Sequence, residues 1–424
     1  MKVAVIGAGP AGLVSAREVI RHGCEVVVFE AADQIGGVWV YDERVEDDPL
    51  GQSPGQTIRC SLYDSLRTNI PRDLMAFLDY TFDSKGGGND TWPRFPHHTK
   101  VLEYLKNFSD HYALAPHIRL SAEVHRIEKS AEGWTVHSGA SNERFDAVII
   151  CNGHYARPRI PTLPGIEHFQ GHLLHSHNYR APNAMVGKRV ALWGTSASGF
   201  DLSGEIDKVA DRTYWCGSAF TEPMSFGATR TAYPSPSGFT ETGKLIVATE
   251  QLDIDTFMYC TGYHYGFPFI SGEIVSVDDN WVNPLYQDII PPTDNTLGFI
   301  GLPYLIIPFP MFEMQAKWFV KQLISEFTLH DLPTRAGKVR ERSEHFQRTG
   351  VNKRHYHRLG DQQFEYYNLL AEQCGQPPVS EWFKQTWSDA KRSREADPIN
   401  FRDIGLATRG PTICPTCPSD QPLP

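Results

Sequence analysis

The sequence of 424 residues predicts an α/β fold made of two Rossmann-like dinucleotide-binding domains, with the second inserted into the first. Two glycine-rich turns, at residues 7–12 and 194–199, each follow a short apolar run and precede a helical pattern. The apolar run at 256–260 then ends in Thr261-Gly262-Tyr263, which resembles the earlier ending Cys151-Asn152-Gly153. We interpret this repeat as a return crossing between the two domains.

The first turn has the glycine spacing of a dinucleotide fingerprint, G-x-G-x-x-G, between an expected strand at 3–6 and an expected helix from 13. Gly7 permits the tight turn, Gly9 lets the backbone approach a pyrophosphate, and Gly12 lets helix and strand pack closely. Pro10 and Ala11 complete the turn. The helix N-terminus supplies N–H donors and a positive dipole end to the phosphates.

An acidic residue stands where a ribose-binding residue is expected. Glu30 directly follows the mostly apolar run 25–29 and lies 21 positions after Gly9, from 9 to 30. A carboxylate there accepts hydrogen bonds from a ribose diol. Further along, the paired glycines of Gly36-Gly37-Val38-Trp39 favour a second close approach of the backbone to the same ligand, although a plain loop remains the alternative.

Thr68-Asn69-Ile70-Pro71 reads as a turn that begins a short helix, with Pro71 in its first position. From the residues alone, Asn69 is better explained as a helix cap than as a functional residue. We expect a helix at about 100–112, strands near 118–127, 134–137 and 145–150, a Pro-rich connector at 157–161, and a short buried strand at 297–301. The Pro-broken segment 307–310 should precede a helix at about 311–327, and the charged last 100 residues should be helical.

The second turn repeats the three motif positions of the first with one change. The apolar run 189–193 leads into Gly194-Thr195-Ser196-Ala197-Ser198-Gly199, followed by an expected helix at 200–206 that carries Asp201. Ser196 stands where the first turn has its middle glycine, so the motif is weak alone and gains weight from its order of strand, turn and helix. We predict a second nucleotide site here.

Composition and charge exclude several classes of protein. Hydrophobic residues make up 41% and charged residues 21% of the chain, which indicates a globular protein. A net charge of −10 argues against a nucleic-acid partner. No uninterrupted apolar run approaches the roughly 20 residues that span a bilayer, and a strand beginning at residue 3 leaves no room for a signal sequence. We therefore expect a cytoplasmic protein without a membrane anchor, and secretion after removal of a signal peptide is the alternative left open.

Eight scattered cysteines favour reduced thiols and an intracellular setting. Cys414 and Cys417 form a C-x-x-C in a Pro-rich tail with no following helix, so we interpret it as an ordinary terminus. No Ser-His-Asp order and no set of residues with metal-ligand spacing is present, and no metal site is expected.

Between the connector and the second turn, residues 169–179 read FQGHLLHSHNY and fit the pattern F-x-G-x-x-x-H-x-x-x-Y, with His175 and Tyr179 at its last two positions. This pattern identifies flavin-containing monooxygenases, and the chain resembles that family over nearly its whole length. The resemblance includes both glycine turns, Gly37-Val38-Trp39, Thr68–Pro71, Thr261-Gly262-Tyr263 and a stretch at 308–315 that ends in Gln315.

The resemblance implies that the first turn binds FAD and the second binds NADPH, in a class B flavoprotein monooxygenase. It divides the chain into an FAD domain at 1–157, an NADPH domain at 158–290, and a return to the FAD domain with a helical end at 291–424. In that family, reduced flavin and O₂ form a C4a-hydroperoxide, which transfers oxygen to a nitrogen or sulfur lone pair. The cofactor performs this chemistry, while the protein orients it and excludes water.

The resemblance also transfers roles to residues of this chain. Asn69 matches a family asparagine near the flavin, and its amide suits holding the peroxide, so it becomes the expected catalytic residue. For His175 we weigh structural support above direct chemistry. The expected cofactor-binding residues are Gly7, Gly9, Pro10, Ala11, Gly12, Glu30, Gly37, Val38, Trp39, Thr68, Asn69, Gly194, Ser196, Ala197, Ser198, Gly199, Asp201, Thr261, Gly262 and Gln315.

Two departures from the family pattern stand out. Ser196 replaces a glycine that most relatives have. Relatives also place an arginine just after the strand that follows the second turn, where it holds the 2′-phosphate of NADPH. Here Thr213–Ser218 contains none, and Arg212 and Arg230 are candidates to replace it. The preference for NADPH over NADH is left open.

The expected substrate is a small tertiary amine or alkaloid, or a thioether, with O₂ as co-substrate. Similarity to soluble plant and insect members and the lack of an apolar C-terminal anchor separate the chain from membrane-bound animal members. The alternatives are a Baeyer–Villiger monooxygenase, against which Tyr179 argues because those enzymes usually carry Trp there, and a flavin-dependent NADPH oxidase or disulfide reductase. The oligomeric state, including a homo-oligomer, is left open.

Overall fold

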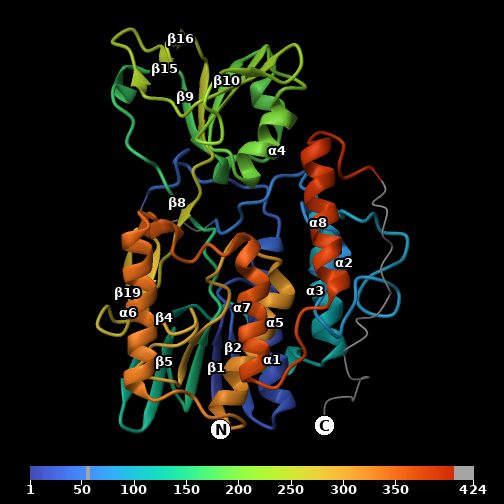
Figure 1. Cartoon of the computed structure of the whole chain (residues 1–424), viewed down its shortest axis with the longest axis vertical. Helices are drawn as coiled ribbons and strands as arrows, with labels where there is room; N and C mark the ends of the chain where they lie inside the picture. Colours follow the sequence, from blue (N-terminus) through green and yellow to red (C-terminus); the bar gives the residue numbers. More distant parts are fainter. Residues whose placement is uncertain (54–57, 405–424) are drawn as a thin grey trace. The chain divides into compact units, whose positions relative to one another are not determined.

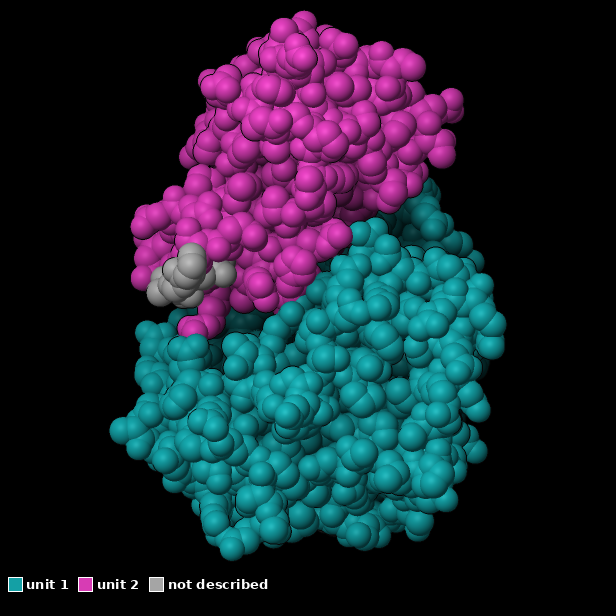
Figure 2. All heavy atoms as spheres, turned by 90° about the vertical axis from the view of Figure 1, so that its left-hand side faces the viewer, with its two compact units in different colours: residues 1–40, 67–153, 265–424 teal, residues 41–66, 154–264 magenta. Residues whose placement is uncertain are grey.

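The computed structural model describes residues 1–53 and 58–404. The predicted C-x-x-C at Cys414 and Cys417 lies outside the described residues. The chain forms two compact units (Figure 2): unit 1 comprises Met1–Val40, Arg67–Gly153 and the chain from Tyr265, and unit 2 comprises Tyr41–Leu66 and His154–His264. The chain therefore leaves unit 1 twice and returns to it twice.

Unit 1 is built on a five-stranded parallel sheet in the order β21-β7-β1-β2-β3. Its strands are β1 (Lys2–Ile6), β2 (Glu25–Phe29), β3 (Ile118–Arg119), β7 (Ala147–Ile150) and β21 (Leu297–Phe299). β1 lies at the centre, between β2 and β7, so its side chains are buried on both faces.

Alternate residues of β1 face two different layers, as the pleat of a strand requires. Val3 and Val5 pack in one core with helices α1 (Pro10–Arg21), α5 (Pro308–Leu323) and α7 (Gln363–Gln373), which lie together beside β1 and β2 in Figure 1. Ala4 and Ile6 pack in a second core with an antiparallel sheet of β4 (Val124–Ser130), β5 (Gly133–Ser138) and β6 (Ser141–Phe145). The other α-helices among the described residues of unit 1 are α2 (Arg72–Met75), α3 (His98–His111), α6 (Leu332–Arg348) and α8 (Glu381–Ala396).

Unit 2 is built on a six-stranded sheet in the order β12-β13-β11-β10-β17-β9, parallel except for β12. The strands are β9 (His172–His175), β10 (Arg189–Trp193), β11 (Arg212–Cys216), β12 (Met224–Ser225), β13 (Arg230–Tyr233) and β17 (Thr256–Tyr259). Val190 and Leu192 of β10 pack with helix α4 (Ala197–Ile206), and Ala191 packs with the small sheet of β14 (Gly238–Phe239), β15 (Leu245–Val247) and β16 (Glu250–Leu252).

The predicted fold class, two Rossmann-like halves with parallel sheets, is confirmed. The compact units differ from the predicted division at 157/158 and 290/291 in residues 41–66, 154–157 and 265–290. Residues 41–66 belong to unit 2, where the Arg180 guanidinium donates to the carbonyl oxygens of Asp42, Arg44 and Cys60 at 2.7, 2.9 and 3.2 Å. Residues 265–290 belong to unit 1, because Tyr265 and its neighbours pack into the core around Ala4 and Ile6.

The expected helix from 311 begins earlier, at Pro308. Pro308 and Pro310 occupy its first turn, where backbone N–H groups have no acceptor within the helix and proline is tolerated. No helix in the described part of the chain combines the length and the apolar character needed to cross a bilayer.

Candidate nucleotide-binding sites

The first glycine-rich turn is so tightly closed that two of its glycines have no room for a side chain. Gly7 has a φ of +103°, and a Cβ there would lie 2.5 Å from the carbonyl oxygen of Cys151. A Cβ on Gly12 would lie 1.8 Å from the carbonyl oxygen of Gly7. Gly9 precedes α1 with an extended φ of −76°, and Pro10 and Ala11 form the first turn of that helix. The strand therefore leads directly into a helix N-terminus that no side chain caps, which is the geometry of an anion site.

A second backbone segment lies against this turn. The N–H of Gly36 donates to the carbonyl oxygen of Ala8 at 3.0 Å. A Cβ on Gly37, whose φ is +57°, would lie 2.8 Å from the Cα of Gly9. Gly37, Val38 and Trp39 form the 3₁₀ helix η1 (Gly37–Trp39), and the Trp39 ring meets the edge of Phe309 at 6.3 Å. The two glycine segments thus lie in direct backbone contact, which a side chain on Gly37 would prevent.

Glu30 lies at the mouth of the first turn, as its spacing predicts. Its carboxylate accepts from the N–H of Ala8 at 2.6 Å and from the N–H of Ala32 at 2.8 Å. These bonds hold the carboxylate at the end of β2, and each oxygen keeps a further lone pair for a hydroxyl donor. The side chain is buried, with 8% of the residue exposed.

Thr68 and Asn69 lie on a loop that is held from both sides within unit 1. The N–H of Thr68 donates to the carbonyl oxygen of Pro96 at 2.9 Å, and its carbonyl oxygen accepts from Arg402 Nε at 2.9 Å. Thr68 Oγ1 is buried and has no hydrogen-bond partner among the described residues, which marks a place for a polar ligand atom. Asn69 is half-buried and lies two residues before Pro71. Pro71 is the N-cap of α2, whereas the sequence predicts it as the first residue of that helix.

Gln315 is fully buried on α5, and the protein itself uses both ends of its amide. Oε1 accepts from the N–H of Gly301 at 3.0 Å, and Nε2 donates to the Tyr366 hydroxyl at 2.8 Å. The Tyr366 hydroxyl donates in turn to the carbonyl oxygen of Gln287 at 2.6 Å. Gln315 therefore fixes the backbone after β21, and its predicted contact with a cofactor stays a prediction.

The second turn has the same closure as the first. Gly194 has a φ of +144°, and a Cβ there would lie 2.1 Å from the carbonyl oxygen of Cys260. A Cβ on Gly199 would lie 1.8 Å from the carbonyl oxygen of Gly194. Ser196 precedes α4 with a φ of −80°, nearly the value of Gly9. Because that φ is open to any residue, a serine can occupy the middle position without backbone strain.

The other predicted residues of the second site surround this turn within unit 2. Ala197 and Ser198 form the first turn of α4, and the Asp201 carboxylate accepts from the Tyr63 hydroxyl at 2.8 Å. Thr261 and Gly262 follow β17; the Thr261 hydroxyl donates to the Arg159 carbonyl oxygen at 2.5 Å, and the Gly262 carbonyl oxygen accepts from the N–H of Arg159 at 2.9 Å.

His175 and Tyr179 of the family pattern are buried inside unit 2. Nδ1 of His175 accepts from the N–H of His177 at 3.0 Å, and burial, with His177 adding to it, lowers the pKa of His175 to about 3. A neutral imidazole that caps a backbone turn fits the predicted supporting role. The Tyr179 ring packs on Tyr63 at 6.1 Å, and burial, followed by the Glu205 carboxylate, raises the pKa of its hydroxyl.

The sequence reasoning missed a buried ionic cluster in unit 1. Arg17 of α1 is fully buried and bonds Glu18, Asp79 and Glu313 at 2.6, 2.5 and 2.8 Å. Glu313 Oε2 also accepts from the N–H of Leu78 at 2.6 Å. The cluster ties the helix of the first turn to α5 and to the segment after α2. The signal in the sequence was a charged pair, Arg17-Glu18, on the buried face of a helix.

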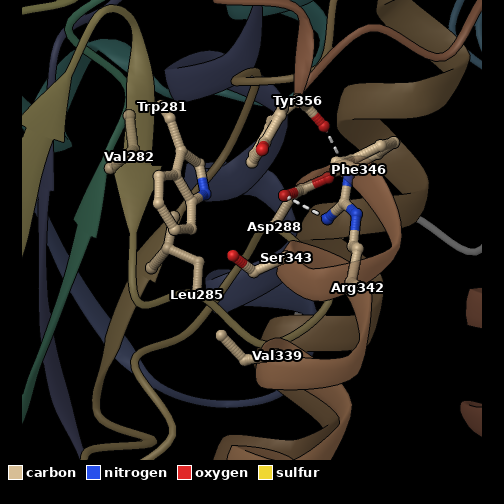
Figure 3. Close-up of a pocket in the computed structure, with 9 residues that line it drawn as sticks. All are labelled: Trp281, Val282, Leu285, Asp288, Val339, Arg342, Ser343, Phe346 and Tyr356. Atoms are coloured by element: carbon tan, nitrogen blue, oxygen red, sulfur yellow. Dashed lines mark hydrogen bonds and ion pairs between the residues drawn. The ribbon is translucent and has the colours of Figure 1, made fainter. Parts of the chain in front are cut away.

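A small cavity lies elsewhere in unit 1, between β20 (Trp281–Asn283) and α6 (Figure 3). Its volume of about 20 Å³ is enough for one water molecule. Asp288 faces Arg342 there, with Oδ1 accepting from Arg342 at 2.6 Å. None of the predicted site residues lines this cavity, and it is too small for a substrate.

Comparison with known proteins shows which family the chain resembles over nearly its whole length. A family model described as "FMO-like: Flavin-binding monooxygenase-like" matches residues 1–234 and 229–386. The chain is 38% identical over 421 residues to "Flavin-containing monooxygenase FMO GS-OX-like 3" of Arabidopsis thaliana, covering 95% of this chain and 93% of that protein.

Two solved structures have the same fold. S-allyl-L-cysteine S-oxygenase from Allium sativum is 36% identical and superposes with a TM-score of 0.91, covering 95% of both chains. Tmm from Pelagibacter sp. strain HTCC7211 is 22% identical with a TM-score of 0.80, covering 99% of this chain and 96% of that chain, and this likeness shows the fold alone.

Proposed function

The chain belongs to the flavin-binding monooxygenase-like family, and from this membership we propose that it transfers one oxygen atom of O₂ to the sulfur of a small thioether. The carrying observation is the superposition with an S-oxygenase at a TM-score of 0.91 over 95% of both chains. The chain is an oxidoreductase, and the comparisons support FAD and NADPH as its cofactors. In the balanced reaction, NADPH supplies two electrons, the thioether becomes a sulfoxide, and the second oxygen atom leaves as water.

We assign FAD to the first turn and NADPH to the second. The residues present fit a dinucleotide in unit 1, because Gly37 brings a second backbone segment against Gly9 and no side chain caps the N-terminus of α1. Glu30 would hold the ribose diol of FAD, while Gly194, Ser196 and Gly199 would hold the pyrophosphate of NADPH. Bound flavin, reduced by NADPH, supplies the oxygen-activating chemistry.

Asn69 is the residue we assign to the reacting group. Its amide donates and accepts hydrogen bonds, and its loop is held by Pro96 and Arg402 through Thr68. An amide fixed in position can orient the oxygen that is transferred and keep water from it. NADPH consumption would then lead to oxygenated substrate and not to release of hydrogen peroxide.

The proposal is tested with three probes of comparable size: a thioether, a tertiary amine and a cyclic ketone. The FAD-loaded protein receives NADPH and isotopically labelled O₂, and products are identified by mass. We expect labelled sulfoxide, with the amine and the ketone oxidised at least about tenfold more slowly. Faster labelling of the amine would assign N-oxygenation, ester formation from the ketone would assign Baeyer–Villiger chemistry, and peroxide alone would assign an NADPH oxidase; each of these would overturn the proposal.

The role of Asn69 is tested with Asn69→Ala. We expect FAD to remain bound, while the ratio of sulfoxide formed to NADPH consumed falls about tenfold or more, the effect of losing one hydrogen bond of about 1.4 kcal/mol. The matched control is Asn142→Ala, an exposed position on β6. If Asn69→Ala couples NADPH to sulfoxide as well as the control does, the assignment is wrong.

A further inference from the structure

The two units share the order strand, turn, helix and strand, and they differ in the residue that follows the second strand. In unit 1, Glu30 follows Gly9 by 21 positions, from 9 to 30, and comes directly after β2. In unit 2, Gly217 follows Ser196 by 21 positions, from 196 to 217, and comes directly after β11. The equivalent of the ribose-binding acid is therefore a glycine.

The backbones around these two positions match. The N–H of Gly7 donates to the carbonyl oxygen of Phe29 at 2.8 Å, and the N–H of Gly194 donates to that of Cys216 at 2.9 Å. In unit 1 the Glu30 carboxylate accepts from the N–H of Ala8, the residue after the first glycine.

In unit 2 the residue after the first glycine is Thr195. A Cβ on Gly217 would lie 3.4 Å from its nitrogen and 2.6 Å from its Cγ2. Thr195 thus fills the space where unit 1 has the carboxylate. Residue 217, a glycine, has no side chain that could hydrogen-bond to a ribose hydroxyl.

The chemistry at this position selects between the two nicotinamide coenzymes. An acid after the second strand accepts from the ribose 2′-hydroxyl of NADH and repels a phosphate, whereas an arginine nearby binds the 2′-phosphate of NADPH. The segments that follow β11 and β13, residues 217–229 and 234–243, are described throughout and contain no lysine, arginine or histidine. Their two acids, Glu222 and Glu241, are exposed and lie six and eight positions beyond the strand ends at Cys216 and Tyr233. The side chain next to Gly217 is the exposed hydroxyl of Ser218.

The two arginines of these strands lie at their opposite ends. Arg212 begins β11, four residues before Cys216, or about 13 Å along the strand. Arg230 begins β13 and pairs with Thr213. Arg212 donates to the carbonyl oxygen of Ala228 at 3.0 Å, and Arg230 reaches Ser203 Oγ at 3.4 Å, two turns into α4. The hypothesis that Arg212 or Arg230 replaces the missing arginine is therefore wrong.

From this arrangement we infer that unit 2 does not select its coenzyme by the charge at the adenosine 2′-position, so that NADH serves as hydride donor about as well as NADPH. The inference rests on the proposed function in one respect, the assignment of the coenzyme to unit 2. The hydroxyl of Ser218 donates equally to a ribose hydroxyl or to a phosphate oxygen. Hydride transfer is unaffected, because the nicotinamide is the same in both coenzymes.

The test measures binding as well as turnover. The FAD-loaded full-length protein is titrated with NADP⁺ and with NAD⁺ by calorimetry, and flavin reduction by NADPH and NADH is followed without O₂. We expect the two dissociation constants to agree within tenfold. A preference of tenfold or more for either coenzyme would overturn the inference while leaving the proposed function standing, whereas failure of both to bind would overturn the two together.

A designed variant tests the position itself. Ser218→Arg should strengthen NADP⁺ binding about tenfold or more, the effect of a charge-assisted hydrogen bond, and leave NAD⁺ binding unchanged. Thr249→Arg adds the same charge on the exposed β15–β16 turn of unit 2 and should change neither constant. An equal response of both coenzymes to Ser218→Arg, or none, would show that residue 218 does not face the 2′-position.

Discussion

The two units share one backbone design at their glycine-rich turns but stabilise it by different means. Both place a glycine where a Cβ would strike the strand end or the turn, at Gly7 and Gly12 and again at Gly194 and Gly199. Between them, Gly9 and Ser196 have nearly the same φ, −76° and −80°, so this middle position does not require glycine. The comparison separates glycines that the fold requires from a glycine that it only permits.

The difference lies behind the turns. In unit 1, α1 is held by buried charges, with Arg17 bonded to Glu18, Asp79 and Glu313. In unit 2, α4 is held by hydroxyl groups, with Tyr63 on Asp201 at 2.8 Å and Ser65 on Glu205 at 2.7 Å. Unit 2 also buries two uncharged histidines, His175 and His177. The two units should therefore respond differently to acid and to loss of charge.

The largest expected difference between the two units is in how their stability depends on pH. Burial, with His177 adding, lowers the pKa of His175 to about 3, and burial with Arg180 lowers the pKa of His177 to about 4. Because an unfolded histidine titrates near 6.5, the unfolded state takes up protons first. Unit 2 should lose about 1.4 kcal/mol per pH unit for each histidine below about pH 6.5.

Unit 1 should keep its stability to a lower pH than unit 2. Burial acts to raise the pKa of Asp79, but Arg17 and Arg21 outweigh it and lower the value to about 2. Its contribution to stability is present above the unfolded pKa of about 3.9 and is lost between about pH 4 and pH 2. Hydrogen exchange, corrected for intrinsic rates, should show β9 losing protection before α1. Loss in the opposite order, or at one common pH, would contradict the comparison.

Glu313→Ala should be the next largest effect. It removes one carboxylate from a cluster whose three cations, Arg17, Arg21 and Lys317, remain, and breaking such a buried arrangement costs about 3–5 kcal/mol. Denaturant unfolding followed by hydrogen exchange should show the loss in unit 1 and not in unit 2. Glu341→Ala, at an exposed position of α6, is the control and should stay within about 0.5 kcal/mol. A loss shared equally by both units would refute the separate anchoring of α1.

Gly12→Ala and Gly199→Ala should each disturb one unit by about 1–3 kcal/mol, because the added Cβ would lie 1.8 Å from a carbonyl oxygen. Gly12→Ala should release FAD, measured as flavin absorbance after gel filtration. Gly199→Ala should keep FAD and weaken NADP⁺ binding. If Gly199→Ala released FAD while Gly12→Ala kept it, the assignment of cofactors to units would be reversed.

Ser196→Gly should be the smallest effect. The φ of −80° at Ser196 needs no glycine, and the serine side chain makes no capping hydrogen bond to α4. We expect a change in stability within about 0.5 kcal/mol and a change in NADP⁺ affinity below threefold. A larger gain in affinity, seen by calorimetry, would mean that the serine side chain keeps the pyrophosphate away from the helix.

The sequence alone predicted both turns, the strands and helices around them, the fold class and the family. These predictions held because a strand–turn–helix is local: Gly7, Gly9, Gly12 and Glu30 lie within 30 residues, and the spacing carries the geometry. The helix start at Pro308 was missed, because proline usually breaks a helix and only its place in the first turn makes it acceptable.

Tertiary structure decided what depends on segments far apart in the chain. Arg212 and Arg230 are close in sequence to the predicted second site. They are nevertheless the first residues of β11 and β13, so they lie at the ends of the strands opposite to that turn. Arg17 and Glu313 are 296 positions apart and meet only because α1 and α5 pack on one face. Spacing along a chain determines a turn and its flanking elements, whereas strand register and helix packing determine which charges meet, and no local pattern records either.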